Sequence, residues 1–264
     1  MGIVNVTPDS FSDGGQFVDS DVAIEHGLSL AADGADILDI GGESTRPGAA
    51  AVSEEQELVR ILPVVEGLAR QTNVQISIDT RKPAVAVAAV KAGASIWNDV
   101  SALTWSPDSA DTAAALQCDV VLMHAQGAPK TMQDDPQYDD VVAEVFAFLA
   151  ERLDACSQAG IDKTKVIVDP GIGFGKTLQH NLTLLAYLDR FEALGCPVLL
   201  GASRKRFIGA LDRDGPVDNR LGGSLAAAMA GYQRGASILR VHDVYETRQT
   251  LKVLYGIENA LVTP

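Results

Sequence analysis

The sequence lacks the features that would place it at once in a specialised class. Its three cysteines in 264 residues, Cys118, Cys156 and Cys196, are odd in number and far apart, so neither a disulfide framework nor a Cys-x-x-Cys metal site fits. Cys118 and Cys196 stand where predicted strands begin, which favours the role of small buried apolar residues. No apolar stretch approaches the roughly 20 residues of a membrane span, and no secretory signal pattern is present. These absences predict a cytoplasmic protein that does not associate with membranes.

Positive charge is also scarce. The chain has 21 Lys and Arg against 35 Asp and Glu, which gives a net charge of −14. That balance disfavours nucleic acid as a partner, because nonspecific nucleic-acid binding needs a basic surface. It also means that an anionic substrate needs a local cationic pocket, since the overall field opposes its approach.

What the sequence does contain is a regular series of short β-branched runs, separated by stretches that predict helices. The predicted strands are 2–7, 36–41, 75–80, 95–100, 119–124, 165–170, 197–202 and 237–242. The polar residues at or near their ends are Asn5, Glu43, Asp79, Asn98 with Asp99, His124, Asp169, Ser203 with Lys205, and Arg240 with His242. Eight such units predict an α/β fold, a (β/α)8 TIM barrel in a single domain over residues 1–264, with the active site at the C-terminal ends of the strands.

Three of the intervening segments carry clear helical signals. Residues 53–71 have apolar side chains at helical spacing, and Ser53 with Gln56 resembles a capping box. Residues 141–159 also have one apolar face and end at Gly160, a plausible C-terminal cap. Residues 219–234 are rich in alanine, which permits close packing and predicts a subunit contact.

Two segments, Thr7–Phe17 and Glu43–Ala51, predict neither strand nor helix. Both are rich in Gly, Pro and Ser and follow the first two strands, on the face of a barrel where mobile lids occur. They could also be ordinary connections. The charged and aromatic residues in each favour lids, because a plain turn does not need them.

The acidic and amide residues at three strand ends predict a ligand site. Asp79, Asn98 and Asp169 end the third, fourth and sixth strands. A single Asp at such a position is more often a helix cap. Several on the one catalytic face of a barrel favour a shared ligand. Two carboxylates and an amide can bracket a heterocycle with an amino-pyrimidinone edge, because carboxylates accept from its N–H and NH2 groups.

Cations follow the last two strands. Ser203-Arg204-Lys205-Arg206 comes after a strand end that contains Gly201, and Arg240-Val241-His242 ends the eighth strand. Consecutive cations are more often a solvated surface. The region after strands seven and eight of a barrel, however, is the usual phosphate site, and helix N-termini also favour anions. We therefore predict a diphosphate site.

The segment Asp169–Thr177, Asp-Pro-Gly-Ile-Gly-Phe-Gly-Lys-Thr, looks at first like a nucleotide-binding loop. It misses the P-loop pattern because Pro170 stands where the first glycine belongs. Its glycines are predicted to let the backbone approach a flat ligand closely. No cluster has zinc spacing, and Asn5 could offer an oxygen to a Mg²⁺ ion held mostly by phosphate and water.

Taken together, these motifs resemble the dihydropteroate synthase family over most of the chain. The segments that carry the resemblance are Gly2–Gly15, Asp39–Gly48, Ile78–Thr80, Trp97–Asp99, Met123–His124, Asp169–Gly175, Ser203–Lys205 and Arg240–His242. The resemblance implies a transferase of folate biosynthesis, a target of sulfonamides, that acts as a homodimer and uses Mg²⁺. Its substrates would be 6-hydroxymethyl-7,8-dihydropterin diphosphate and 4-aminobenzoate, and its products 7,8-dihydropteroate and diphosphate, through a dissociative, SN1-like substitution.

The resemblance also implies roles for individual residues. It assigns Asp79, Asn98, Asp169 and Lys205 to the pterin, Met123 and Phe174 to the pocket wall, and Arg240 to the ring. It assigns Asn5, Arg240 and His242 to the diphosphate and its magnesium, with Ser203 as a further substrate ligand. Phe11, Asp13, Thr45, Arg46 and Pro47 would build the aminobenzoate site on the two loops. Lys205, Asp13, Asp79 and Asp169 are the implied catalytic residues.

Two departures from the family pattern and two alternatives remain. The family has an N-terminal hairpin before its first strand, whereas here the strand begins at Gly2, and Arg206 stands where some members have Ser. A pterin-dependent methyltransferase would share the pterin contacts without needing the diphosphate cations or the two loops. A noncatalytic pterin-binding paralogue would have decayed loops, and both loop motifs are intact here.

Overall fold

The computed structural model describes residues 1–6, 16–44, 52–127 and 131–260, with the backbone only at 16–19. Its strands are β1 (Gly2–Asn5), β2 (Ile37–Gly41), β3 (Gln75–Asp79), β4 (Ile96–Asp99), β5 (Asp119–Met123), β6 (Val166–Asp169), β7 (Val198–Leu200) and β8 (Ala236–Leu239). Its α-helices are α1 (Gln16–Ala32), α2 (Glu54–Gln71), α3 (Pro83–Ala92), α4 (Ser109–Leu116), α5 (Val141–Gln158), α6 (Leu178–Ala186), α7 (Arg206–Leu211), α8 (Leu221–Tyr232) and α9 (Val244–Ala260). Short 3-10 helices are η2 (Lys163–Lys165), η3 (Leu188–Leu194) and η4 (Val217–Arg220).

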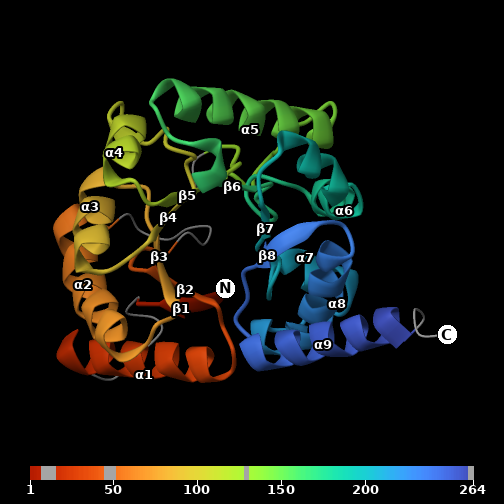
Figure 1. The fold of residues 1–264 in the computed structure, drawn as a ribbon. Coiled ribbons are helices and arrows are strands. Elements are labelled where there is room, and N and C mark those ends of the chain that lie inside the picture. Colours follow the sequence, from red (N-terminus) through yellow and green to blue (C-terminus); the bar gives the residue numbers. More distant parts are fainter. Residues whose placement is uncertain (7–15, 45–51, 128–130, 261–264) are drawn as a thin grey trace.

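The strands form one parallel sheet in chain order, β1 to β8, within the described residues. The two edges of the sheet meet, because Gly2 forms a parallel bridge with Val241, and the amide of Ile3 donates to the Val241 carbonyl at 3.1 Å. Figure 1 shows the strands at the centre and the helices on the outside. This is an α/β architecture consistent with a TIM-like barrel, as the sequence predicts.

The predicted helix signals are confirmed. The Ser53 hydroxyl accepts from the Gln56 amide, and the Gln56 side chain accepts from the Ser53 amide, so α2 begins with a full capping box. Helix α5 ends just before Gly160, whose φ of +87° suits a residue without a β-carbon. The alanine-rich segment forms η4 and α8 rather than one helix.

Side chains alternate between the two faces of each strand, and this alternation creates the site. The inward residues at one end of the barrel are apolar and form a separate buried cluster of Met1, Ile37, Ile96, Val121, Ile167 and Leu199. At the other end the inward residues are polar. Register places Asn5 beside Gly41, Gly41 beside Asp79, and Asp79 beside Asn98, so these residues form one row across four strands.

The structure corrects the edges of several predicted elements. Strand β2 ends at Gly41 as predicted, and the other seven strands end one to three residues earlier than predicted, so Arg240 and His242 follow β8 rather than belonging to it. The first loop was predicted to reach Phe17, but α1 already begins at Gln16. Most of both loops, residues 7–15 and 45–51, lies outside the described residues.

All three cysteines are buried and unpaired, as expected. No helix among the described residues is long and apolar enough to cross a membrane.

Candidate active site

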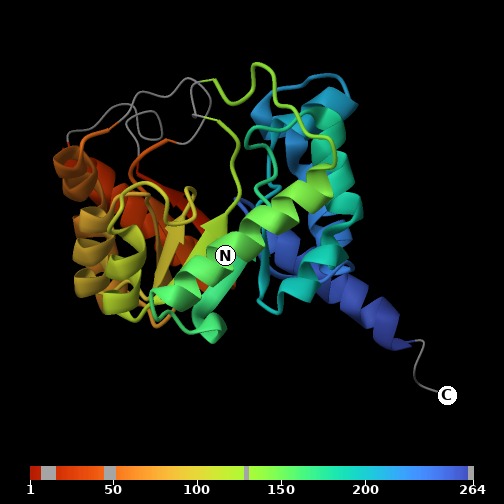
Figure 2. The same ribbon diagram turned by 90° about the horizontal axis from the view of Figure 1, so that it is seen from above.

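A cavity of about 600 Å³ opens at the C-terminal ends of the strands. Figure 2 shows this face in profile, with the described part of the segment that leads into α5 above the sheet. Of the predicted site residues, those that line the cavity are Asn5, Asp79, Phe174, Ser203, Lys205, Arg240 and His242. Asn98, Met123 and Asp169 are buried within the same end of the barrel. Phe11, Asp13, Thr45, Arg46 and Pro47 lie outside the described residues.

A buried ionic group forms the floor of the cavity on the side of β2 to β4. The Arg240 guanidinium contacts the Asp39 carboxylate through Nε at 2.6 Å and the Asp79 carboxylate through Nη2 at 2.8 Å. The Asn98 amide donates to both oxygens of Asp39, at 3.3 and 3.2 Å. Asp39 is fully buried. One carboxylate therefore orients both the Arg240 cation, which lines the cavity, and the buried Asn98 amide.

Burial raises the pKa of two carboxylates at this end of the barrel, Asp79 and Asp169. Desolvation raises the pKa of Asp79 to about 7, against the opposing effect of the Arg240 charge. Desolvation also raises the pKa of Asp169, which the Gly171 amide at 2.7 Å and the nearby Lys205 and Arg240 counteract. Asp79 can thus change its charge near pH 7, and at Asp169 burial favours the neutral form while its hydrogen bond and the nearby cations oppose it.

Asp99, next to Asn98, has the structural capping role that an Asp at a strand end often has. Its carboxylate accepts from the amides of Ser101 and Leu103, both at 2.8 Å, and it is fully buried. It therefore shapes the connection after β4. Neighbouring residues at one strand end have different roles because their side chains point to opposite faces of the sheet.

The wall on the side of β6 and β7 combines an aromatic ring with a cation. The Lys205 ammonium lies 4.1 Å from the centre of the Phe174 ring. Burial lowers the pKa of Lys205 to about 8, and the positive charge of Arg240 adds to this effect. A flat heterocycle between the Phe174 wall and the Asp79 floor would thus meet an aromatic face, a cation and a carboxylate.

Ser203 and His242 join the ends of β7 and β8. The Ser203 hydroxyl lies 3.0 Å from His242 Nδ1 and also accepts from the His242 backbone amide at 3.2 Å. Burial and the charges of Arg204 and Arg240 lower the pKa of His242 to about 4, so the ring is neutral at pH 7. With the serine proton directed to Nδ1, the other ring nitrogen carries the N–H and can donate to an anion.

The loop between β6 and α6 is held by unusual internal contacts. The Lys176 ammonium lies 2.9 Å from His124 Nδ1 and donates to the carbonyls of His124, at 3.3 Å, and Phe174, at 3.0 Å. Gly171 has φ +70°, and a β-carbon there would overlap the His124 carbonyl oxygen. The sequence predicts that the glycines of this loop allow close approach of a flat ligand. At Gly171 the structure shows a different cause: the loop packs so closely against β5 that a side chain would not fit.

A second buried lysine lies at the ends of β2 and β3. Lys82 pairs with Glu43 at 2.8 Å and with the fully buried Glu57 at 2.5 Å. Glu43 also pairs with Arg81 at 3.0 Å, and Arg81 stacks on the Trp105 ring at 4.0 Å. This ionic network ties the start of the second loop to α2 and α3.

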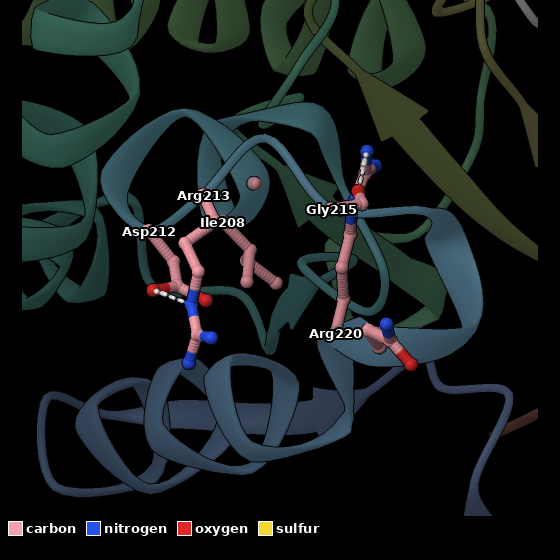
Figure 3. Close-up of a pocket in the computed structure, with 7 residues that line it drawn as sticks. Ile208, Asp212, Arg213, Gly215 and Arg220 are labelled. Atoms are coloured by element: carbon pink, nitrogen blue, oxygen red, sulfur yellow. Dashed lines mark hydrogen bonds and ion pairs between the residues drawn. The ribbon is translucent and has the colours of Figure 1, made fainter.

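A smaller cavity of about 360 Å³ lies beside α7 and η4. Figure 3 shows its lining, in which Arg213 pairs with Asp212. Both side chains are largely exposed, and Arg220 donates there to the Gly215 carbonyl. An exposed ion pair of this kind contributes little, and the lining carries no buried reactive group, so the larger cavity is the candidate active site.

The described residues fit a magnesium ion only if the substrate brings most of its ligands. They contain no group of three or more His, Cys, Asp or Glu side chains that could hold a metal. Asn5 lines the cavity, and its side chain makes no hydrogen bond within the part of the chain that the structure describes. One amide oxygen matches Mg²⁺ coordinated chiefly by phosphate and water.

The residue types at strand ends point to Glu43 but do not reveal the contacts of Asp39 or Lys176. Asp39 had a usable signal, because a charged residue inside an apolar strand is rarely buried without a partner. Lys176 had none, since its role depends on how the loop folds back onto β5. Met123 is buried at the end of β5 and is not among the residues that line the cavity.

Comparison with known proteins places the chain among pterin-dependent enzymes. Residues 1–242 match the family model described as pterin binding enzyme. Dihydropteroate synthase of Escherichia coli K12 is 51% identical, over 96% of this chain and 89% of that protein. The Xanthomonas albilineans dihydropteroate synthase structure with 4-aminobenzoic acid matches with a TM-score of 0.93 and 54% identity, over 98% of this chain and 92% of that one. Its complex with 7,8-dihydropteroate matches with a TM-score of 0.89 and 51% identity, over the same fractions.

Proposed function

The chain belongs to the dihydropteroate synthase family of pterin-binding enzymes, and we propose which of its residues carry each part of the reaction. It is a transferase of folate biosynthesis that joins 6-hydroxymethyl-7,8-dihydropterin diphosphate to 4-aminobenzoate and releases diphosphate. One observation carries the assignment of residues: the cavity has carboxylates and an amide on one side and cations on the other, with Arg240 between them.

The pterin is assigned to the acidic side. Its N–H and NH2 groups need acceptors, which Asp79 and Asp169 supply, while Asn98 can both donate and accept. Phe174 and Lys205 cover the ring face, and Met123 is proposed to support the pocket wall from its buried position at the end of β5. Arg240 reaches the ring from the floor, because two of its nitrogens are already held by Asp39 and Asp79.

The diphosphate is assigned to the side of β7 and β8. His242 would donate through its free ring N–H, and Ser203 fixes that ring. Arg240 keeps unused N–H groups and can contact the diphosphate as well as the ring. Asn5 would hold a Mg²⁺ ion bound to the diphosphate, and this ion would neutralise charge on the leaving group. The protein residues thus position the pterin, stabilise the departing anion and need no covalent nucleophile, in line with a dissociative, SN1-like substitution.

The aminobenzoate is assigned to the rim of the cavity and to the loops. Arg206 lines the cavity, is exposed, and makes no hydrogen bond or ion pair within the described residues. We assign it to the substrate carboxylate in place of the serine of some relatives. Phe11, Asp13, Thr45, Arg46 and Pro47, which lie outside the described residues, remain proposed parts of this subsite.

The remaining parts of the proposal concern the whole molecule. We propose a complete (β/α)8 barrel in a single domain, active in the cytoplasm as a homodimer. The edge-closing bridge between Gly2 and Val241 supports the barrel. Exposed apolar side chains on α9, namely Tyr245, Val253, Tyr255 and Ile257, support a subunit contact, because α9 projects from the rest of the fold (Figures 1 and 2).

The direct test is to follow diphosphate release by the purified chain with pterin diphosphate, Mg²⁺ and 4-aminobenzoate. Release is expected only when both organic substrates are present, with formation of dihydropteroate in equal amount. Continuous release at the full rate without 4-aminobenzoate would indicate a hydrolase and contradict the proposal. Omitting Mg²⁺ tests the metal separately.

A further inference from the structure

Lys176 is an anomaly among the buried charges of this protein. It is 3% exposed, and no carboxylate lies within ion-pair distance of its ammonium among the described residues. Lysine is almost never buried this deeply without a charged partner. Lys82, buried to a similar degree at 4%, has two such partners in Glu43 and Glu57. Lys176 therefore needs another explanation.

The acceptors around Lys176 match its protons in number. A lysine ammonium has three N–H donors, and its neighbours are His124 Nδ1, the His124 carbonyl and the Phe174 carbonyl. Burial lowers the pKa of His124 to about 3, so its ring is neutral and Nδ1 can accept. Burial lowers the pKa of Lys176 itself to about 7; as a neutral amine it would donate to the two carbonyls and accept from an Nδ1–H of His124. In either protonation state its hydrogen bonds are made within the protein.

The contacts of Lys176 connect two elements that both face the cavity. His124 extends β5, since its amide donates to the Asp169 carbonyl at 3.0 Å. Phe174 belongs to a turn closed by its own amide and the Gly171 carbonyl at 3.1 Å, and the Gly171 amide holds the Asp169 carboxylate. The Phe174 ring, in turn, lies against Lys205. A shift of the Phe174 carbonyl would move the aromatic wall and one of the carboxylates together.

We propose that Lys176 is a positioning residue for the pterin: it fixes the loop after β6 to the end of β5, and so holds Phe174 and Asp169 in place. This inference rests on the proposed pterin site. Lys176 acts through these two residues and does not touch the ligand. The diphosphate side of the cavity, formed by residues after β7 and β8, does not depend on it.

The experiment measures the affinity of 6-hydroxymethyl-7,8-dihydropterin and of inorganic diphosphate with Mg²⁺ by calorimetry. Lys176→Met keeps the length of the side chain and removes its three donors. We expect it to weaken the pterin at least tenfold and the diphosphate less than twofold. Lys176→Gln, which keeps one donating amide, should recover part of the loss and serves as the test protein if Lys176→Met does not fold. Hydrogen exchange over residues 169–177 should accelerate in both variants.

Lys165→Met is the control, because Lys165, like Lys176, donates to a backbone carbonyl, that of Gln117, but lies before β6 at the opposite end of the barrel. It should change the affinity of neither ligand more than twofold. Unchanged pterin affinity in the Lys176 variants, or equal loss of both ligands, overturns the proposal. If the wild-type chain binds no pterin, the proposed function fails instead, and the two failures are thereby distinguished.

Discussion

The two sides of the barrel mouth bury charge in opposite ways. On the side of β2 to β4, Asp39 and Asp79 share one guanidinium, and Asn98 adds neutral donors to Asp39. On the side of β7 and β8, Lys205 and His242 have no carboxylate within ion-pair distance among the described residues, and burial lowers the pKa of each. The first side has spare acceptors and the second has spare donors. A ligand with a hydrogen-bond-donating ring and an anionic tail matches both.

Arg240 is the residue that joins the two sides. It is the partner of both carboxylates, and it also contributes to the lowered pKa values of Lys205 and His242. The chain as a whole carries a net charge of −14, so we propose that this local reversal of sign allows a diphosphate to bind. Single substitutions can test whether the two sides bind different parts of the substrate.

Arg240→Met should have the largest effect because it damages both sides at once. It leaves Asp39 and Asp79 as unpaired buried carboxylates and removes a cation from the diphosphate. Loss of one partner from a buried charge pair typically costs about 4 kcal/mol, or roughly a thousandfold in kcat/KM. Steady-state kinetics and thermal unfolding would measure the two consequences, and activity within tenfold of wild type would contradict the central role of Arg240.

Asp79→Asn should weaken the pterin strongly and selectively. The substitution keeps the shape of the side chain but replaces one acceptor by a donor that faces the N–H groups of the ring. Removing a charged hydrogen-bond partner of this kind costs about 2–3 kcal/mol, roughly 30- to 150-fold in affinity. Calorimetry with the unphosphorylated pterin measures it. Near-native affinity would show that Asp79 is not a ring acceptor.

His242→Ala should have a moderate effect confined to the diphosphate side. Losing one hydrogen bond to a charged group corresponds to about 1.5 kcal/mol, or roughly tenfold in affinity for pterin diphosphate. The unphosphorylated pterin should bind as in wild type. Equal losses for the two ligands would argue against a divided cavity.

Pterin affinity should also depend on pH through Asp79. Burial raises its pKa to about 7, so the carboxylate is protonated below that pH and cannot accept two hydrogen bonds from the ring. Affinity should therefore rise with pH by up to about tenfold per unit between pH 5.5 and 7, then level off. In Asp79→Asn the rise should be much shallower. An unchanged slope in the variant would assign the titration to another group.

The smallest effect is expected at the exposed rim. Arg206→Ser should raise the KM for 4-aminobenzoate only about threefold, since exposed charge pairs contribute about 0.2–1 kcal/mol. The uncharged analogue 4-aminobenzamide should be unaffected, which provides the control. A similar change in KM for both compounds would show that Arg206 does not contact the carboxylate.

The fold and much of the site could be predicted from the sequence because each strand is visible as a short run of neighbouring residues. Asp79, Asn98 and Asp169 each end an apolar run, and parallel strands bring such ends together. The ion pair between Asp39 and Arg240 joins residues 201 positions apart and depends on the closing of the sheet, which no local pattern encodes. The contacts of Lys176 likewise depend on the conformation of a glycine-rich loop against β5.

The most direct test of the divided cavity is a crossed binding measurement. Asp79→Asn and His242→Ala are each titrated with unphosphorylated pterin and with inorganic diphosphate plus Mg²⁺, alongside the wild type. The account predicts that Asp79→Asn loses the pterin and keeps the diphosphate, whereas His242→Ala loses the diphosphate and keeps the pterin. If either variant loses both ligands to the same extent, the two sides of the mouth do not act as separate subsites, and the account is contradicted.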